Sequence, residues 1–168
     1  FNREYIEPKA HRYFMVADPV AISIKGAPQK EAHILLHPDH PEQGVRTLLG
    51  TGNVLIAQED FKRLGEGYLH RLMDYGNLRL EGKTFRWISG EYEEYKNAAD
   101  QGKIIHWVPK ESKLNIEVMM DNGQKLQGVG EEALSCAAEG EIIQLERMFF
   151  VRVGQKEKNL IRCWYLHR

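Results

Sequence analysis

Cysteine is scarce in this sequence: Cys136 and Cys163 are the two present, and they lie far apart. They form no CxxC pair, which argues against a disulfide framework and against a thiolate zinc site. We therefore expect two reduced, buried thiols. Long apolar runs are also missing, because no segment approaches the roughly 20 residues that cross a bilayer, and a secretory signal pattern is absent. These absences predict a cytoplasmic protein without a membrane partner.

The common catalytic motifs are absent as well. The chain has no GxSxG, no P-loop, no GxGxxG and no His-Glu-x-x-His. Three pairs of carboxylates stand in polar, turn-like surroundings, which is typical of solvated surface rather than of an acid–base pair. They are Glu93 with Glu94, Glu131 with Glu132, and Glu139 with Glu141. We predict no catalytic residue in this chain.

Charge of one sign is not in excess, since 23 Lys and Arg face 24 Asp and Glu, for a net charge of −1. A general polyanion binder would be strongly basic, so any nucleic acid must be held by a few well-placed side chains. The length of 168 residues suits one domain or two small ones. Because the chain starts at Phe1 and its first methionine, Met15, lies in an apolar run, we expect a fragment of a longer protein.

Short stretches of alternating polar and apolar residues, separated by turns, predict an all-β fold with short helices. Between residues 20 and 24, for example, Val20, Ile22 and Ile24 share one face. The predicted strands are 20–24, 32–36, 46–49, 54–57, 68–72, 78–81, 84–88, 103–108, 115–120, 125–129, 142–153 and 160–167. The predicted helices are 59–64 and 131–138. The strands fall into two successive groups, which fit two small β-barrels packed together.

Turn residues predict how some of these strands pair. Three hairpins are expected, and they join 46–49 to 54–57, 115–120 to 125–129, and 142–153 to 160–167. The second is the clearest, because Asn122 and Gly123 supply the positive φ angles of a type I′ turn. We also expect 32–36 to return beside 20–24, and the polar stretch 92–102 to be mobile.

Residues 37–44, His37-Pro38-Asp39-His40-Pro41-Glu42-Gln43-Gly44, form a stiff stretch that we call the proline loop. Two prolines restrict its backbone, Gly44 permits a positive φ where the chain turns into the next strand, and polar side chains point outward. Such a loop presents groups to a partner, although a connection with reduced entropy is the plainer alternative. His37, Asp39 and His40 are possible zinc ligands, but no fourth ligand is near, so we expect turn-capping histidines and no metal site.

Arg12 stands beside two aromatic residues, Tyr13 and Phe14. A guanidinium next to two rings suits an unstacked RNA base, which stacks on flat surfaces while its edge accepts and donates hydrogen bonds. The alternative is that the two rings begin a core strand and that Arg12 is its solvated edge. By residue type alone, the core strand is favoured.

Two further arginines stand where apolar residues are expected. In the stretch Gln144-Leu145-Glu146-Arg147, strand alternation places Arg147 on the face of Leu145, where a charge needs a partner or an RNA ligand. Gln144 can both donate to and accept from a base edge, and arginine presents a bidentate fork. Arg71, between apolar neighbours, is a similar case. These residue types predict an RNA-reading surface.

Five motifs in this order carry a family resemblance. They are Arg12-Tyr13-Phe14-Met15-Val16-Ala17-Asp18-Pro19-Val20, the proline loop, Ile104-Ile105-His106-Trp107-Val108, Gln144-Leu145-Glu146-Arg147 and Tyr165-Leu166-His167-Arg168. Over nearly the whole chain they resemble the C-terminal anticodon-binding region of glutamyl-tRNA synthetases of the archaeal and eukaryotic type. The resemblance implies two consecutive β-barrels of the glutaminyl-tRNA synthetase type that bind the tRNA anticodon loop. It also implies a parent ligase whose ATP- and Mg-dependent chemistry resides in an N-terminal catalytic domain, the intramolecular partner of this module; its HIGH-like and KMSKS-like motifs are absent here.

The same resemblance supplies candidate site residues. The positions that match anticodon-loop contacts in the family are Arg12, Asp39, Arg71, Gln144 and Arg147. Two positions depart from the glutaminyl enzymes: Asp39 replaces an asparagine and accepts but does not donate, and Met73 replaces a second arginine after Arg71. A pocket with fewer donors suits an enzyme that accepts more than one first anticodon base, as glutamate anticodons require.

The domain organisation implied by the resemblance has three parts. Residues 1–12 lead in from the absent catalytic region, 13–103 form the first barrel and 104–168 the second, with exchange of strands between the barrels left open. We expect no cofactor bound to this chain itself. The alternatives are the equivalent module of a glutaminyl-tRNA synthetase, a metal-binding β-barrel enzyme that uses the histidine-rich loop, and a packing domain between larger parts.

Overall fold

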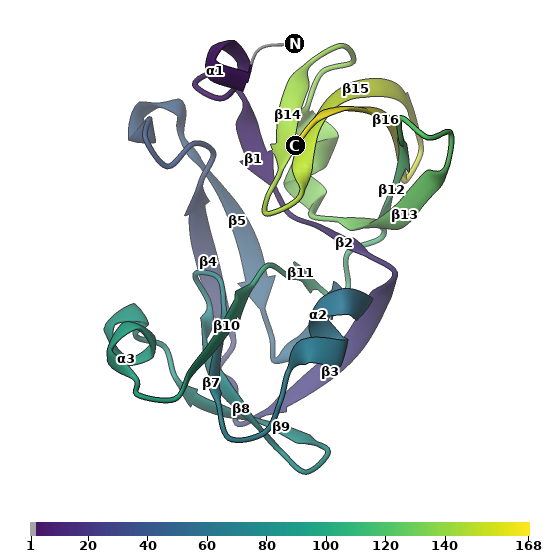
Figure 1. Cartoon of the computed structure of the whole chain (residues 1–168). Coiled ribbons are helices and arrows are strands. Elements are labelled where there is room, and N and C mark those ends of the chain that lie inside the picture. Colours follow the sequence, from purple (N-terminus) through teal and green to yellow (C-terminus); the bar gives the residue numbers. More distant parts are fainter. Residues whose placement is uncertain (1–2) are drawn as a thin grey trace.

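Strands make up most of the chain, and its helices are short (Figure 1). The structure, a computed structural model, describes residues 3–168. The strands are β1 (His11–Tyr13), β2 (Met15–Ala17), β3 (Pro19–Lys25), β4 (Lys30–Leu35), β5 (Val45–Gly50), β6 (Asn53–Ala57), β7 (Leu69–Leu72), β8 (Gly76–Glu81), β9 (Thr84–Ser89), β10 (Gln101–Ile105), β11 (Val108–Pro109), β12 (Leu114–Met119), β13 (Lys125–Gly130), β14 (Ile142–Leu145), β15 (Phe149–Glu157) and β16 (Leu160–His167). The helices are α1 (Arg3–Ile6), α2 (Gln58–Arg63) and α3 (Tyr92–Asn97), with 3-10 helices η1 (Pro41–Gln43) and η2 (Glu132–Cys136). The expected all-β fold with short helices is confirmed.

Seven strands in the order β1-β14-β15-β16-β12-β13-β2 curve into a nearly closed barrel, seen at the upper right of Figure 1. The two edge strands of this sheet are separated in the chain by Phe14 alone. β1 pairs in parallel with β14, and β2 pairs in antiparallel with β13. The segment 11–17 therefore joins both edges of a sheet whose other strands come from residues 114–167. We call this sheet the barrel.

The other large sheet, which we call the second sheet, has the order β10-β7-β8-β9-β3-β6-β11. Its core surrounds Tyr75 and Trp107, both fully buried, whose ring centroids lie 5.1 Å apart. The indole Nε1–H of Trp107 donates to the carbonyl oxygen of Met73 at 2.9 Å, which satisfies its polar atom inside the core. Gly76 lies against the ring of Trp87, where a Cβ would come within 1.9 Å, so this strand accepts no larger residue there.

The hairpin of β4 and β5, which we call the arm, forms a two-stranded sheet of its own. Two predicted pairings are therefore wrong. Strand 32–36 does not lie beside 20–24, because β4 pairs with β5 through the proline loop. Strand 46–49 does not pair with 54–57, because β6 pairs with β3 and β11 instead. Alternation showed which residues form strands, but the turn at Gly52 passes the chain from the arm to the second sheet.

Three local predictions also differ from the structure. The polar stretch 92–102 forms α3 and the start of β10, because buried Tyr95 anchors it and donates from its hydroxyl to the carbonyl oxygen of Gly102. The hairpin 115–129 is confirmed, but its turn is not type I′: Gly123 has a positive φ of 82° and Asn122 does not. The helix predicted at 131–138 is the shorter 3-10 helix η2.

The two cysteines differ in exposure. Cys163 faces inward from β16 and is buried, and burial raises the pKa of its thiol to about 12. Cys136 ends η2 and is exposed, so the prediction of two buried thiols is wrong for this one. Neither forms a disulfide.

Segments are shared between the two halves of the chain. β2 from near the start lies in the barrel, whereas β11, which follows His106, extends the second sheet. The division into barrels at residues 13–103 and 104–168 stays a prediction. None of the helices within residues 3–168 has the length and apolar character needed to span a bilayer.

Candidate nucleic-acid interface

Arg12 and Gln144 are direct neighbours in the parallel pairing of β1 with β14. The Arg12 guanidinium lies 3.6 Å from a carboxylate oxygen of Glu146, with both side chains about one fifth exposed or less. Gln144 is half-buried on β14, where it lies between Arg12 of β1 and Phe150 of β15. The barrel edge therefore presents a guanidinium, a carboxylate and an amide side by side.

The proline loop is fixed next to this edge. Buried His37 accepts a hydrogen bond from the backbone N–H of Asp39 through Nδ1 at 3.1 Å, so its Nε2–H donates to the carbonyl oxygen of Glu7 at 2.8 Å. The backbone N–H of Arg12 donates to the carbonyl oxygen of Leu36 at 2.8 Å. Gly44 has a φ of 103°, which confirms the expected turn into β5. Asp39 is exposed at the loop tip.

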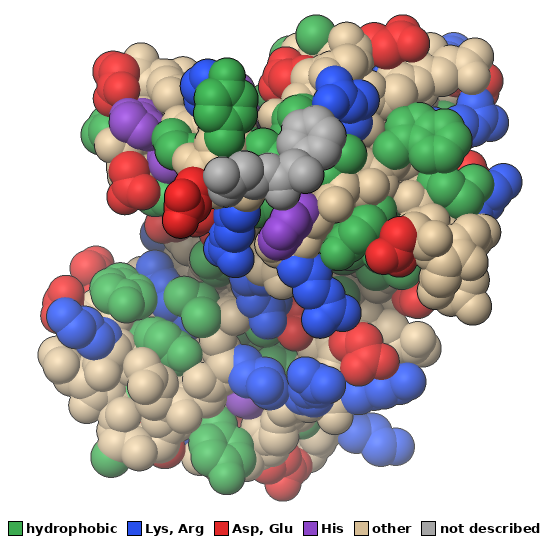
Figure 2. Space-filling view, turned by 45° about the horizontal axis from the view of Figure 1, so that its top comes forward, with side chains coloured by type: hydrophobic (Ala, Val, Ile, Leu, Met, Phe, Trp, Pro, Cys, Tyr) green, Lys and Arg blue, Asp and Glu red, His purple; other side chains and the backbone are tan. Residues whose placement is uncertain are grey.

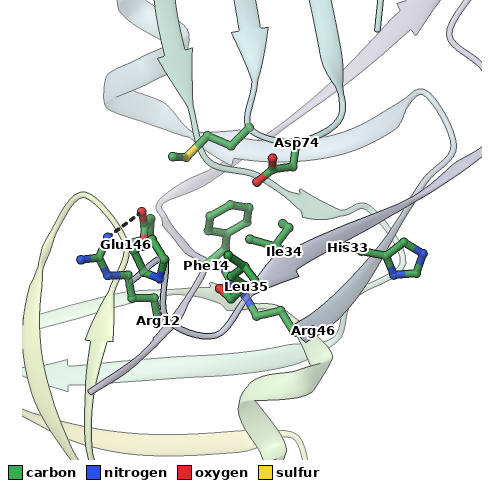
Figure 3. Close-up of a pocket in the computed structure, with 10 residues that line it drawn as sticks. Arg12, Phe14, His33, Ile34, Leu35, Arg46, Asp74 and Glu146 are labelled. Atoms are coloured by element: carbon green, nitrogen blue, oxygen red, sulfur yellow. Dashed lines mark hydrogen bonds and ion pairs between the residues drawn. The ribbon is translucent and has the colours of Figure 1, made fainter. Parts of the chain in front are cut away.

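A pocket of about 250 Å³ lies between Arg12, the arm and the turn after β7 (Figure 3). Its lining residues are Arg12, Phe14, His33, Ile34, Leu35, Pro38, Arg46, Met73, Asp74 and Glu146. Two buried N–H groups of this lining, at Nε of Arg12 and Nη2 of Arg46, have no hydrogen-bond partner. These two nitrogens have no exposed surface, and the rest of the lining supplies both kinds of group, guanidinium donors at Arg12 and Arg46 and carboxylate acceptors at Asp74 and Glu146.

Arg71 lies on β7 and is buried. Its Nη1 donates to the side-chain oxygen of Asn77 at 3.0 Å and to the carbonyl oxygen of Gly90 at 3.1 Å, and its guanidinium lies 5.5 Å from the ring centre of Tyr92. Burial lowers the pKa of Arg71. Arg71 and Tyr92 line a smaller pocket of about 240 Å³ that shares Met73 with the first. The two pockets therefore adjoin.

Arg147 lines neither of these two pockets but a third one, together with Asp60 and His106. β14 ends at Leu145 and Arg147 sits in a turn with a φ of 65°, so the inference that strand alternation places it on the apolar face is wrong. Its guanidinium forms a two-pronged ion pair with Asp60 of α2 at 2.9 and 3.2 Å. Nη1 also donates to Nδ1 of His106 at 2.9 Å, and the Nε2–H of that ring donates to the carbonyl oxygen of Met15 at 2.8 Å.

The aromatic rings beside Arg12 belong to the core. Tyr13 and Phe14 are 4% and 1% exposed, so the core-strand alternative is the correct one for both rings. Burial, and then the charge of Glu141, raise the pKa of Tyr13 to about 12. Stacking partners for an RNA base must therefore come from elsewhere. Exposed Tyr92, beside Arg71, is one such ring.

Figure 2 shows Lys and Arg side chains gathered on the face where the two lobes of the molecule, one built on the barrel and one on the second sheet, meet. The total charge is close to zero, so this local concentration is a matter of placement rather than of composition. Within residues 3–168, no group of three or more His, Cys, Asp and Glu side chains is arranged to hold a metal ion. His37 is instead occupied by backbone groups.

Arg46, which lines the pocket, and its buried partner Glu131 were not among the predicted site residues. Arg46 and Glu131 form an ion pair at 2.9 Å with side chains 2% and 1% exposed, so the prediction that Glu131 is solvated is wrong. Arg46 had a detectable signal, because it alternates with Leu48 on the inward face of β5. Glu131 had none, since a Glu-Glu pair after a glycine is typical of a surface turn.

The comparisons with known proteins agree with this geometry. Residues 10–99 match the family model described as "tRNA synthetases class I (E and Q), anti-codon binding domain". Similar curated proteins include the glutamate-tRNA ligases of Methanobrevibacter smithii, 35% identical, and Pyrococcus furiosus, 37% identical, each over 99% of this chain. The chain spans 29% and 30% of the length of these two relatives. Since the family model covers more than half of its residues, the chain belongs to the family of anticodon-binding domains of class I (E and Q) tRNA synthetases.

Proposed function

We propose that this chain is the anticodon-binding module of a cytoplasmic glutamate-tRNA ligase. Its partners are the anticodon stem-loop of glutamate tRNA and a catalytic domain of the same polypeptide, which attaches glutamate with ATP and Mg. In this proposal, residues 1–12 lead in from the catalytic domain, and 13–103 and 104–168 correspond to two anticodon-binding barrels. The names of the similar archaeal proteins favour glutamate over glutamine as the amino acid.

The observation that carries the proposal is the mixed lining of the pocket beside Arg12, which offers guanidinium donors and carboxylate acceptors. Nucleobase carbonyls, ring nitrogens and phosphate oxygens are acceptors, and an anticodon loop exposes all of them on unstacked nucleotides. The guanidinium of Arg12, whose side chain is one fifth exposed, can donate to such a ligand. Glu146 and Asp74 at the same pocket accept from an exocyclic amino group, so the lining can distinguish base edges.

The five candidates take different parts in this proposal. Arg12 and Gln144 read base edges at the barrel rim, Asp39 fixes the geometry of the proline loop, and Arg71 lines a base pocket with Tyr92. Arg147 also contacts an anticodon base. Its guanidinium then leaves the ion pair with Asp60 and binds the RNA instead. Met73 stands at the wall shared by the two pockets, and its apolar side chain tolerates more than one first base.

Gln144→Glu tests the proposal, because the substitution keeps the size of the side chain and removes its donor. We expect affinity for tRNA with a glutamate anticodon to fall by about 1–3 kcal/mol, the usual value of one bidentate base contact. Binding is measured by fluorescence titration with the full-length ligase that carries this chain.

Gln155→Glu is the matched control, since it adds the same charge at an exposed position of β15. It should leave affinity unchanged. Equal losses in the two variants, or no binding of tRNA by the unmodified protein, would contradict the proposal. Tighter binding of a glutamine anticodon than of a glutamate anticodon would instead support a glutaminyl enzyme.

A further inference from the structure

The arm carries the proline loop but belongs to neither large sheet. Its strands pair with each other over six residue pairs, from Lys30 with Gly50 to Leu35 with Val45. No strand of the barrel or of the second sheet pairs with β4 or β5 within residues 3–168. The position of the loop relative to Arg12 therefore depends on contacts outside the regular strand ladders.

One set of these contacts converges on a buried carboxylate. Glu131 accepts from Nε of Arg46 at 3.0 Å and from the backbone N–H of Phe14 at 2.6 Å. The backbone N–H of Glu131 donates in turn to the carbonyl oxygen of Phe14 at 3.1 Å. Because Phe14 separates β1 from β2, the carboxylate binds the segment 11–17 at the point where neither barrel ladder holds it.

The other end of this contact lies at the base of the proline loop. Nη1 of Arg46 donates to the carbonyl oxygen of Leu35 at 2.7 Å, one residue before Leu36, which accepts from Arg12. The guanidinium also lies 4.8 Å from the ring centre of Phe14. Glu131, Arg46 and Leu35 thus form a continuous chain of contacts from the barrel to the loop.

Glu131 does not face the pocket beside Arg12. It lines a different pocket, together with Leu48, Pro109 and Glu132, on another side of the arm. A ligand in the first pocket therefore meets Arg46 but not Glu131. Any effect of Glu131 on that ligand has to pass through Arg46 and Phe14.

From these contacts we infer that Glu131 is a positioning residue for RNA recognition. It sets the spacing between the proline loop, with Asp39 at its tip, and the barrel edge that bears Arg12 and Gln144. The carboxylate itself touches no RNA. This inference rests on the proposed function and adds to it a residue outside the predicted interface.

Glu131→Gln is the test, and Glu132→Gln, the same change at an exposed neighbour, is its matched control. The amide still accepts from Phe14 but no longer carries the charge that holds Arg46. We expect affinity for tRNA to fall on the order of tenfold in Glu131→Gln, because a displaced loop misaligns its contacts, and to stay unchanged in the control.

A double-mutant cycle with Asp39→Ala separates positioning from a general loss of stability. If Glu131 acts through the loop, Asp39→Ala weakens binding less in the Glu131→Gln background than in the unmodified protein. Amide hydrogen exchange at Arg12 and Leu36 should also accelerate, while exchange in β8 does not change. Should Glu131→Gln fail to fold, Glu131→Asp, which keeps the charge and shortens the side chain, is measured in its place.

The outcomes are distinct. The positioning role would be overturned if Glu131→Gln bound tRNA with unchanged affinity. It would also be overturned if Asp39→Ala reduced the affinity equally in both backgrounds. Either result would leave the proposed function intact. Failure of the unmodified protein to bind tRNA would overturn the proposed function and this inference with it.

Discussion

Two ion pairs join the barrel to the rest of the molecule, and they differ in their access to solvent. Arg46 and Glu131 are 2% and 1% exposed, whereas Arg147 and Asp60 are 32% and 10% exposed. The buried pair has backbone partners on both sides, and the other pair has water on one side. The buried pair is therefore part of the framework, while the half-exposed pair can open and offer its arginine to a ligand.

The energetic consequences follow from desolvation. A buried ion pair gains little net stability over apolar residues, but the loss of one partner leaves a buried charge uncompensated, which is strongly destabilising. At the other pair, water reaches Arg147, so the loss of Asp60 carries a smaller penalty, although Asp60 itself is buried. Substitutions that remove one charge at a time thus separate the two kinds of contact.

The largest effect is expected for Glu131→Ala. The substitution removes the carboxylate that accepts from the backbone N–H of Phe14, and it leaves Arg46 buried without its counter-charge. The free energy of unfolding should therefore fall by about 3–5 kcal/mol. Urea denaturation followed by circular dichroism measures the change. Glu81→Ala, at the exposed pair with Arg86, is the control and should cost less than about 1 kcal/mol. Equal costs would remove the distinction between buried and exposed pairs.

The second effect concerns pH at the half-exposed pair. Burial, and then the charge of Arg147, lower the pKa of His106 to about 4, against about 6.5 in the unfolded chain. At His106 the folded state binds fewer protons than the unfolded state between these values, so the contribution of His106 to the free energy of unfolding is fully present above pH 6.5. It should fall by up to about 3 kcal/mol as the pH drops toward 4.

His106→Gln isolates this contribution, because the amide donates to Met15 without titrating. Urea titrations at several pH values between 4 and 7.5 should show a flatter pH dependence for the variant than for the unmodified protein. Parallel curves would mean that His106 does not couple the stability of this junction to pH.

The smallest effect is expected on RNA binding at the half-exposed pair. Arg147→Ala should lower affinity for tRNA with the glutamate anticodon by about 1–3 kcal/mol, with little loss for an unrelated tRNA. Asp60→Asn frees the same guanidinium from its ion pair and should not weaken binding. If both variants lose affinity alike, Arg147 serves to join the lobes; if Arg147→Ala weakens both tRNAs alike, it holds a phosphate.

Most local strand positions could be predicted from the sequence, although the predicted strands 103–108 and 142–153 are each broken into two strands. Partners that are distant in the chain could not be predicted. Alternation in 20–24 or 115–120 reflects which face of a strand is buried, which is a local property. The partner of β4 or β6 depends instead on where the whole chain carries it, and two of the predicted pairings failed for that reason. The β12–β13 hairpin was predictable because its partners are adjacent in sequence.

The candidate site divides in the same way. Arg12 and Gln144 stand in separate motifs of the family resemblance, and the structure brings them into register. Arg46 was detectable as a charge in the apolar register of β5, whereas the burial of Glu131 arises from packing between parts more than 80 residues apart. Contacts that join distant segments leave no periodic signal in either one.

The closure of the barrel by residues 11–17 has a consequence for biosynthesis. A ribosome makes these residues before their partners, because β13 and β14 emerge only after more than a hundred further residues. Until then the apolar face of Tyr13 and Met15 has no sheet to cover it, so the nascent chain must keep this strand from pairing elsewhere. The later strands β12 to β16 complete the barrel between β1 and β2.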